Sequence, residues 1–162
     1  MIREANINDI EAIAQINTNV WRTNYKGIIE DDYIEKRTVE EFVKKQKETN
    51  LIENKNINTF IYEENTVIKG FVIGYKSNEK CNCEIMALYV DVEYQRKGIG
   101  TKLIEYMKRY YKENECKKMI IWTIRNLENN TFYKKNGGEI KEEKELNLGN
   151  KNYKGIGFIF EL

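Results

Sequence analysis

The sequence lacks histidine and proline and contains three cysteines among its 162 residues. Without histidine there can be no Ser-His-Asp triad, no Cys-His dyad and no imidazole-ligated metal. A four-thiolate zinc site needs one more cysteine than the chain has. The absent residue types therefore exclude several enzyme classes, and we expect no bound metal.

The chain also lacks an excess of either charge sign, because it has 27 Lys and Arg residues and 26 Asp and Glu residues, and its formal net charge is +1. A surface this balanced does not neutralise many phosphates, so we expect no nucleic-acid partner. No apolar run reaches about 18 residues, and the first residues lack the pattern of a signal peptide. These features predict a cytoplasmic protein that does not enter a membrane.

The cysteines fit a reducing compartment. Cys81 and Cys83 stand two residues apart in a strand-like segment, where a disulfide between them would be strained. We therefore expect Cys81 and Cys83 to be reduced thiols.

The order of apolar patterns predicts one domain spanning residues 1–162. Asn8 with Glu11, and Thr38 with Glu41, have the spacing of helix capping boxes. The predicted strands span residues 2–6, 59–62, 66–75, 83–90, 118–124, 139–148 and 153–162, and helices begin at Asn8, Thr38 and Gly98 and span 127–136. This order predicts a mixed α/β fold: one mostly antiparallel, twisted sheet flanked by helices, with parallel pairing only where a helix intervenes.

The segment from Glu84 to Thr101 has the pattern of an anion site. A nearly all-apolar strand is followed by Gln95-Arg96-Lys97-Gly98-Ile99-Gly100-Thr101, and the next helix opens at Gly98. Free N–H groups at a helix N-terminus carry about half a positive charge and bind phosphates. The alternative is an ordinary strand-to-helix turn, with glycines for geometry and basic residues for solubility.

Two motifs in this order resemble the GCN5-related N-acetyltransferase (GNAT) family. The first is Gln95-x-x-Gly98-x-Gly100 after a hydrophobic strand. The second is the strand Trp122-Thr123-Ile124-Arg125-Asn126 followed by Phe132-Tyr133-Lys134-Lys135-Asn136-Gly137. The predicted element order also resembles that fold from Ile2 to Leu162, so the resemblance covers the whole chain.

The resemblance implies an enzyme that uses acetyl-CoA as cosubstrate. Main-chain N–H groups of Gln95, Arg96, Lys97, Gly98, Ile99, Gly100 and Thr101 would hold the diphosphate, and Leu88, Tyr89 and Val90 would hydrogen-bond the pantetheine arm. The N–H group of Leu88 or a neighbour would polarise the thioester carbonyl. Asn126 would steady the pantetheine or a water; the alternative for Asn126 is a helix N-cap.

Two further residues take catalytic roles by the same resemblance. Tyr133 would be the general acid that protonates the departing thiolate; its alternative is an aromatic core residue. Glu84 would be the general base for the amine, acting directly or through water; its alternative is a solvated carboxylate at a strand end.

The acceptor is expected to contact the segment between the first two helices. Trp21, Tyr25 and the acidic run that begins at Glu30 would suit a cationic amine, such as a polyamine, an aminoglycoside or a lysine side chain. The alternative is two core aromatic residues beside an acidic helix N-terminus.

The sequence thus predicts an N-acetyltransferase that transfers acetyl from acetyl-CoA to a primary amine of a small molecule or peptide, by direct attack in a ternary complex. One alternative is a sensor that binds acyl-CoA without transfer, motivated by Gly137-Gly138 where the family usually has Gly-Phe. Another is an α/β module that binds a nucleotide at the same turn. The strand from 153 to 162 suits either an internal place in the sheet or pairing with a second copy in a homodimer.

Overall fold

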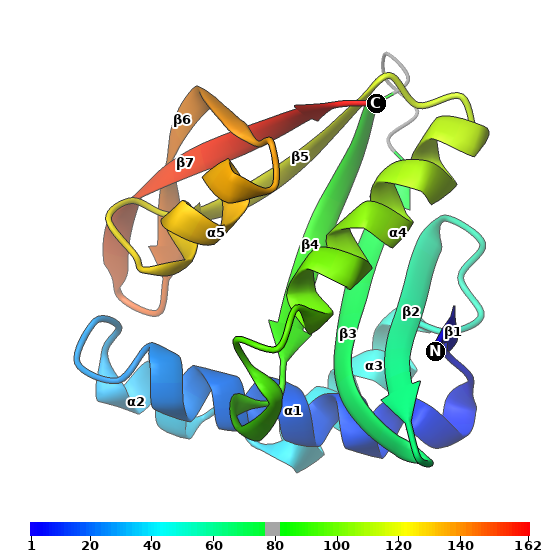
Figure 1. Cartoon of the computed structure of the whole chain (residues 1–162). Helices are drawn as coiled ribbons and strands as arrows, with labels where there is room; N and C mark the ends of the chain where they lie inside the picture. The colour runs from blue at the N-terminus through cyan, green and yellow to red at the C-terminus, as the bar shows by residue number, and fades with distance from the viewer. Residues whose placement is uncertain (77–81) are drawn as a thin grey trace.

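A seven-stranded sheet organises the molecule in a computed structural model that describes residues 1–76 and 82–162 (Figure 1). The strand order is β1-β2-β3-β4-β5-β7-β6, and only the β4–β5 pair is parallel. The strands are β1 (Ile2–Glu4), β2 (Ile57–Glu64), β3 (Val67–Lys76), β4 (Asn82–Val90), β5 (Lys118–Ile124), β6 (Glu139–Leu148) and β7 (Lys151–Glu161). The predicted mixed, mostly antiparallel sheet is confirmed.

Helices cover both faces of this sheet. The α-helices are α1 (Ile10–Asn24), α2 (Asp31–Glu35), α3 (Val39–Thr49), α4 (Ile99–Glu113) and α5 (Asn129–Lys135), and 3-10 turns span Ile7–Asp9 (η1) and Val92–Tyr94 (η2). Successive residues of a strand point to opposite faces, so Phe60 packs with α4 in one core while Ile61 packs with α1 in the other. The helices thereby bury both sides of the central strands.

The first helix starts later than its sequence predicts. The capping residue is Asn6 and not Asn8. The Asn6 side chain accepts a hydrogen bond from the N–H of Asn8 at 2.9 Å, and the Asp9 carboxylate accepts one from the N–H of Asn6 at 2.7 Å. These bonds form η1, and α1 begins only at Ile10. Arg3 holds the same Asp9 carboxylate at 2.8 Å, so a partner from β1 fixes the cap. The second predicted cap is confirmed, since Thr38 Oγ1 accepts the N–H of Glu41.

The chain end occupies an internal place in the sheet. β7 pairs with β5 on one side and with β6 on the other, so β6 is the edge strand at this end (Figure 1). The internal interpretation of the 153–162 strand is therefore correct, and its main-chain groups do not face a second copy.

One cysteine prediction is wrong. Cys83 on β4 forms a disulfide with Cys116, and their Cα atoms lie 6.4 Å apart. Sequence proximity directed attention to Cys81, whereas the chain's return from α4 brings Cys116, 33 residues away, beside Cys83. Both sulfurs lie in the core beneath α4. Cys81 lies outside the described residues.

Candidate active site

Strands β4 and β5 separate in the middle of the sheet. Their parallel pairing covers Asn82 to Ile85 on β4 and stops there (Figure 1). The register between β3 and β4 also shifts at this point, which leaves Met86 as an extra, unpaired residue of a β-bulge. The second half of β4 therefore lacks a neighbour on its β5 side.

The main-chain groups of Leu88 and Val90 face this gap. Asp91 donates its N–H to the carbonyl oxygen of Lys69 at 2.9 Å, so its main chain faces β3. Because peptide groups alternate in direction along a strand, those of Tyr89 also face β3, and those of Leu88 and Val90 face the opposite side. The Val90 carbonyl there accepts the side-chain amide of Gln95 at 3.0 Å. An N–H donor at Leu88 remains available to a ligand.

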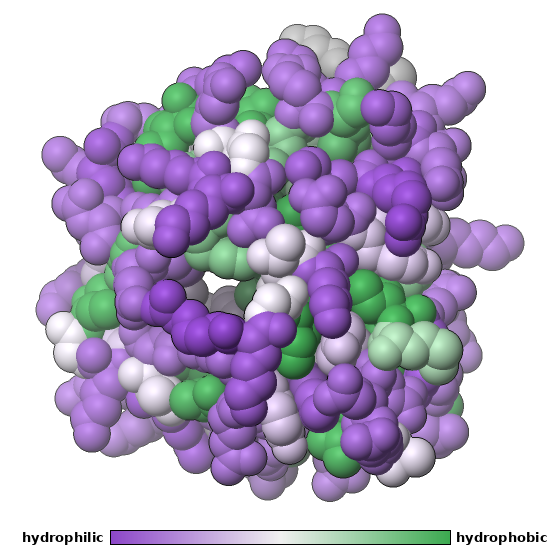
Figure 2. Space-filling view, in the orientation of Figure 1, coloured by the Kyte–Doolittle hydropathy of each residue, from purple (hydrophilic) through white to green (hydrophobic). Residues whose placement is uncertain are grey.

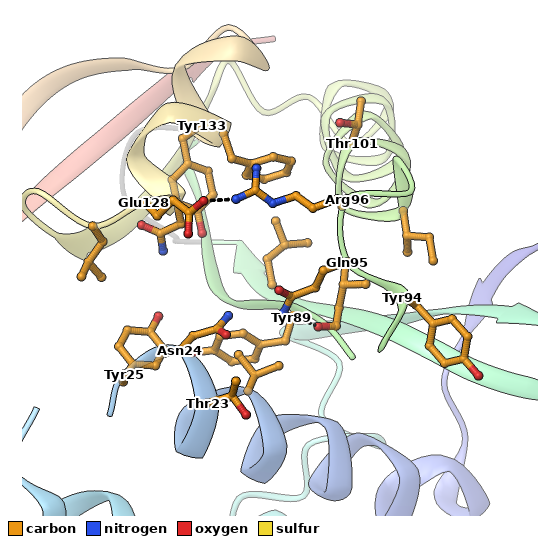
Figure 3. Close-up of a pocket in the computed structure, with 18 of the residues that line it drawn as sticks. Thr23, Asn24, Tyr25, Tyr89, Tyr94, Gln95, Arg96, Thr101, Glu128 and Tyr133 are labelled. Atoms are coloured by element: carbon orange, nitrogen blue, oxygen red, sulfur yellow. Dashed lines mark hydrogen bonds and ion pairs between the residues drawn. The ribbon is translucent and has the colours of Figure 1, made fainter. Parts of the chain in front are cut away.

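A first cavity of about 570 Å³ lies where the sheet opens, between the N-terminal end of α4, the start of α5 and the last turns of α1 (Figure 3). Its lining residues are Val20, Thr23, Asn24, Tyr25, Ile28, Leu88, Tyr89, Val90, Tyr94, Gln95, Arg96, Gly98, Ile99, Gly100, Thr101, Leu127, Glu128, Asn129, Phe132 and Tyr133. Figure 2 shows an opening in the surface, in the region between α5 and α1, with hydrophilic side chains below it and more apolar side chains above it.

The loop before α4 presents main-chain donors to this cavity. Arg96 and Gly98 both adopt left-handed backbone conformations, with φ of 61° and 79°. Within residues 1–76 and 82–162, no N–H group from Gln95 to Thr101 donates to a protein acceptor. These donors lie at the positive end of a 15-residue helix. The loop can therefore bind a diphosphate.

Gly100 brings this loop close to α5. A Cβ atom at position 100 would stand 3.0 Å from Cζ of Phe132, which lines the same cavity. A larger residue would push Phe132 or the loop out of place. The second glycine of the motif thus sets the width of the cavity.

An ion pair crosses the cavity mouth. The guanidinium of Arg96 contacts the carboxylate of Glu128, which precedes α5 (Figure 3). Both side chains are about 80% exposed, so solvent screens their attraction. An incoming phosphate could therefore replace Glu128 as the partner of Arg96 at little cost.

A second, smaller cavity of about 160 Å³ lies on the other side of the gap. Aromatic and aliphatic side chains from α1, β4, β5 and β6 form most of its wall. Its lining residues are Trp21, Tyr25, Ile85, Met86, Ala87, Leu88, Tyr89, Ile121, Trp122, Thr123, Ile124, Asn129, Tyr133, Leu146 and Leu148.

Five residues line both cavities, so the two spaces share part of their wall. They are Tyr25, Leu88, Tyr89, Asn129 and Tyr133. Tyr133 packs between Phe132 and Phe158 with ring centroids 5.3 Å from each, which fixes its ring at the junction. Groups bound in the two cavities would therefore lie on either side of a wall to which Tyr133 contributes.

The junction tyrosines stay protonated. Burial, and then the neighbouring Tyr89, raise the pKa of Tyr133 well above its ordinary value. Burial also raises the pKa of Tyr25 and of Tyr89, and Trp21 Nε1 donates to the Tyr89 hydroxyl at 3.1 Å. The phenols at the junction can therefore donate hydrogen bonds and are poor bases.

Most of the residues predicted from the motifs come together in these walls. The first cavity collects Leu88, Tyr89, Val90, Gln95, Arg96, Gly98, Ile99, Gly100, Thr101 and Tyr133, and the second collects Trp21 and Tyr25.

Four predicted residues lie elsewhere. Lys97 lines neither cavity and donates to the Glu93 carbonyl at 3.1 Å. Asn126 is exposed, has a φ of 65° in a turn, and is not the N-cap of α5, which is Glu128. Glu84 accepts a hydrogen bond from the Tyr75 hydroxyl at 2.9 Å, one residue before Ile85. Glu30 contacts Lys151 at 3.5 Å and accepts the N–H of Asn150 at 3.3 Å.

Sequence reasoning overlooked Asn129. Its side-chain oxygen accepts from Thr123 Oγ1 at 3.3 Å and from the Asn130 amide at 3.0 Å, which leaves its own NH₂ group for the cavities. Thr23 and Asn24 of α1 gave no signal, since only the folded chain brings them to the cavity.

The described residues contain no group of three or more His, Cys, Asp or Glu residues that could hold a metal ion. Likewise, no helix formed by the described residues is long and apolar enough to cross a membrane.

Comparisons with known proteins agree on one family. The acetyltransferase (GNAT) family matches residues 21–138, which is well over half of the chain. A Bacillus subtilis protein named "Uncharacterized N-acetyltransferase YuaI" is 28% identical over 96% of this chain and 90% of its own length. A "Spermidine N(1)-acetyltransferase" from Thermoplasma acidophilum is 24% identical over 87% of this chain and 89% of its own.

Solved structures share the whole fold. The PaiA N-acetyltransferase of T. acidophilum, crystallised in complex with coenzyme A, superposes with a TM-score of 0.78 at 20% identity, over 100% of this chain and 98% of that one. An N-acetyltransferase from Staphylococcus aureus Mu50 superposes with a TM-score of 0.72 at 17% identity, over 99% and 97% of the two chains.

Proposed function

The chain belongs to the acetyltransferase (GNAT) family, and on this basis we propose that residues 1–162 form one domain that transfers acetyl from acetyl-CoA to a primary amine. The observation that carries the proposal is the junction of the two cavities at Tyr133. One cavity presents free main-chain donors and the other offers a separate space for an acceptor. Such an arrangement suits direct transfer between two bound substrates.

The first cavity has the donors that a coenzyme diphosphate needs. The N–H groups of residues 96–101 have no protein acceptor among the described residues, and Gly98 and Gly100 let a ligand approach the backbone. The Arg96 guanidinium adds charge at the mouth. We propose that Gln95 acts indirectly, by tying this loop to the Val90 carbonyl.

The peptide groups of β4 would bind the next part of the coenzyme. Bound acetyl-CoA supplies a thioester carbonyl that is open to attack by an amine. We propose that Leu88 donates its N–H to the oxygen of that carbonyl and that the Asn129 amide assists from the opposite wall.

Tyr133 would act on the leaving group. Its raised pKa keeps the phenol protonated, so it can donate to sulfur throughout the pH range of the reaction. A thiol has a pKa of about 8.5, far below that of this phenol, so complete proton transfer is uphill. We therefore propose that Tyr133 stabilises the departing thiolate mainly by hydrogen bonding.

The amine must lose its proton before it attacks. An alkylamine with a pKa of about 10.4 pays roughly 4 to 5 kcal/mol for deprotonation at pH 7. Glu84 lines neither cavity but precedes Ile85, which lines the second. We propose that Glu84 accepts the amine proton through water, without direct contact with the amine.

We propose that the second cavity is the acceptor site. We also propose that the protein acts in the cytoplasm, where acetyl-CoA is made and used. The acceptor would be a primary amine of a small molecule or of a peptide N-terminus. The relative named for spermidine supports an amine as the acceptor class.

Two measurements on the purified protein test this function. Calorimetry should give tighter binding of acetyl-CoA than of ATP, and an amine panel should release free thiol from acetyl-CoA. Preference for ATP would contradict the coenzyme assignment. Binding of acetyl-CoA without thiol release from any amine would identify a sensor and contradict the transferase.

A further inference from the structure

The wall of the second cavity carries no charged side chain, judged over residues 1–76 and 82–162. Its polar groups are neutral: three tyrosine hydroxyls, two indole N–H groups, Thr123 and Asn129. Resting on the proposed function, we infer that the acceptor is a primary monoamine whose substituent is uncharged and apolar, such as an arylalkyl or branched alkyl group.

The size of the cavity limits this substituent. An apolar protein cavity of about 150 Å³ holds one benzene molecule. The second cavity, at about 160 Å³, therefore accommodates one aromatic ring or a short branched chain. A long linear chain would have to leave the cavity again.

Two cations stack on the tryptophans of this wall. The Arg37 guanidinium lies 3.8 Å from the ring centroid of Trp21, and Lys144 Nζ lies 3.8 Å from that of Trp122. Both tryptophans line the second cavity. The field from these two stacked cations opposes a second positive charge on the acceptor.

The acidic run beyond α1 does not offset them. Glu30 is engaged by Lys151 and by the N–H of Asn150. Asp31 and Asp32 are exposed in the first turn of α2, outside both walls. A second ammonium held inside this cavity would thus lose water without gaining a carboxylate from the wall, which is unfavourable. The acceptor inferred here therefore differs from the polyamine or other cationic amine that the sequence predicted, and that prediction is one outcome of the test below.

Specificity is assigned to three aliphatic side chains. Met86, the extra residue of the β-bulge, is 54% exposed although it is apolar. Leu146 and Leu148 reach the same wall from the edge strand β6. An apolar acceptor group would cover these side chains, so its burial would contribute to binding.

The first experiment compares acceptors at equal concentration. Thiol release from acetyl-CoA is measured with phenethylamine and 3-methylbutylamine against putrescine and spermidine, each near the pKa of its amine. We expect kcat/KM to be at least about tenfold higher for the two monoamines. Equal or higher values for spermidine or putrescine would overturn the inference while leaving the transferase function intact. Acetyl-CoA binding without turnover of any amine would overturn both.

The second experiment introduces a negative charge into the wall of the second cavity. Leu148→Glu should lower kcat/KM for phenethylamine about tenfold or more and raise it for putrescine, with acetyl-CoA affinity unchanged. Ile140→Glu is the matched control, because Ile140 lies on the same strand, is 38% exposed and lines neither cavity. Unaltered acceptor preference in a folded Leu148→Glu protein would contradict the assignment of the wall. Melting curves of both variants establish folding.

Discussion

The two cavities differ in what builds them. Main-chain N–H groups, two glycines and the positive end of α4 dominate the first, and these come from one continuous segment. Side chains from α1, β4, β5 and β6 form the second, and its wall includes two tryptophans and three tyrosines. One cavity is therefore a backbone site and the other a side-chain site.

This difference separates the first site, which depends on backbone conformation, from the second site, whose side chains can vary. In the proposed site a diphosphate would be held by peptide groups, which every sequence has, so the first site would depend on conformation at a few positions. The second site depends on the identity of side chains on strand faces, which can change without altering the fold. Variants that disturb backbone geometry should therefore affect the coenzyme, and variants of wall side chains should affect the acceptor or the chemistry.

The largest effect is expected from Gly98→Val. A β-branched residue at a φ of 79° is strained by about 1–3 kcal/mol, and relief of this strain would turn the loop N–H groups away. Each charge-assisted hydrogen bond lost contributes about 1.5–3 kcal/mol, so we expect acetyl-CoA affinity to fall about 10²-fold or more. Calorimetric titration measures the change.

Gly27→Val provides the control for strain alone. Gly27 has a φ of 76°, has open space around it and lines neither cavity. This variant should lose stability to a similar degree and keep its affinity for acetyl-CoA. Similar affinity losses in both variants would mean that the loop is not a specific coenzyme site.

Tyr133→Phe should lower turnover about 10²-fold and leave acetyl-CoA affinity nearly unchanged, because only the hydroxyl at the leaving group is removed. Steady-state kinetics and calorimetry measure the two quantities. Tyr111→Phe is the control: Tyr111 is a buried residue of α4 that lines neither cavity, and its hydroxyl has no partner among the described residues. Unchanged turnover in Tyr133→Phe would remove Tyr133 from the mechanism.

Asn129→Ala should lower kcat/KM about tenfold, which corresponds to the loss of one hydrogen bond of about 1.5 kcal/mol. Asn126→Ala, three residues earlier in an exposed turn, should have little effect. The pair of variants decides which asparagine contacts the substrates. A larger loss in Asn126→Ala would restore the assignment made from the family resemblance.

The smallest effect is expected from Glu84→Gln and depends on pH. In the parent protein kcat/KM should rise with pH until the amine is neutral, and it should not fall near pH 10, because the raised pKa of Tyr133 keeps this phenol protonated there. Glu84→Gln should lose about threefold to tenfold near pH 7, and the loss should vanish above the pKa of the amine.

Glu142→Gln, on an exposed position of β6, is the control for this profile. A loss in Glu84→Gln that persists at high pH would contradict a role in deprotonation. A decline of the parent activity near pH 10 would contradict the protonated state assigned to Tyr133.

Local sequence patterns predicted the elements around the first cavity better than the wall of the second, for physical reasons. Glycine spacing, strand periodicity and the Thr38 cap are local signals, and the segments that carry them form the expected elements. The partners of Cys83 and Glu30 lie 33 and 120 or more residues away, so no local pattern indicated them. The wall of the second cavity is assembled from equally distant segments. Its neutral lining was therefore visible only in the folded chain.

The central claim is that free N–H groups before and at the start of α4 bind the coenzyme's diphosphate. The most direct measurement is a titration of ¹⁵N-labelled protein with acetyl-CoA, observed through the backbone amide resonances. We predict that the amides of residues 96–101 shift strongly, while that of Gly27 does not. Binding of acetyl-CoA that leaves the 96–101 resonances unchanged would contradict the claim.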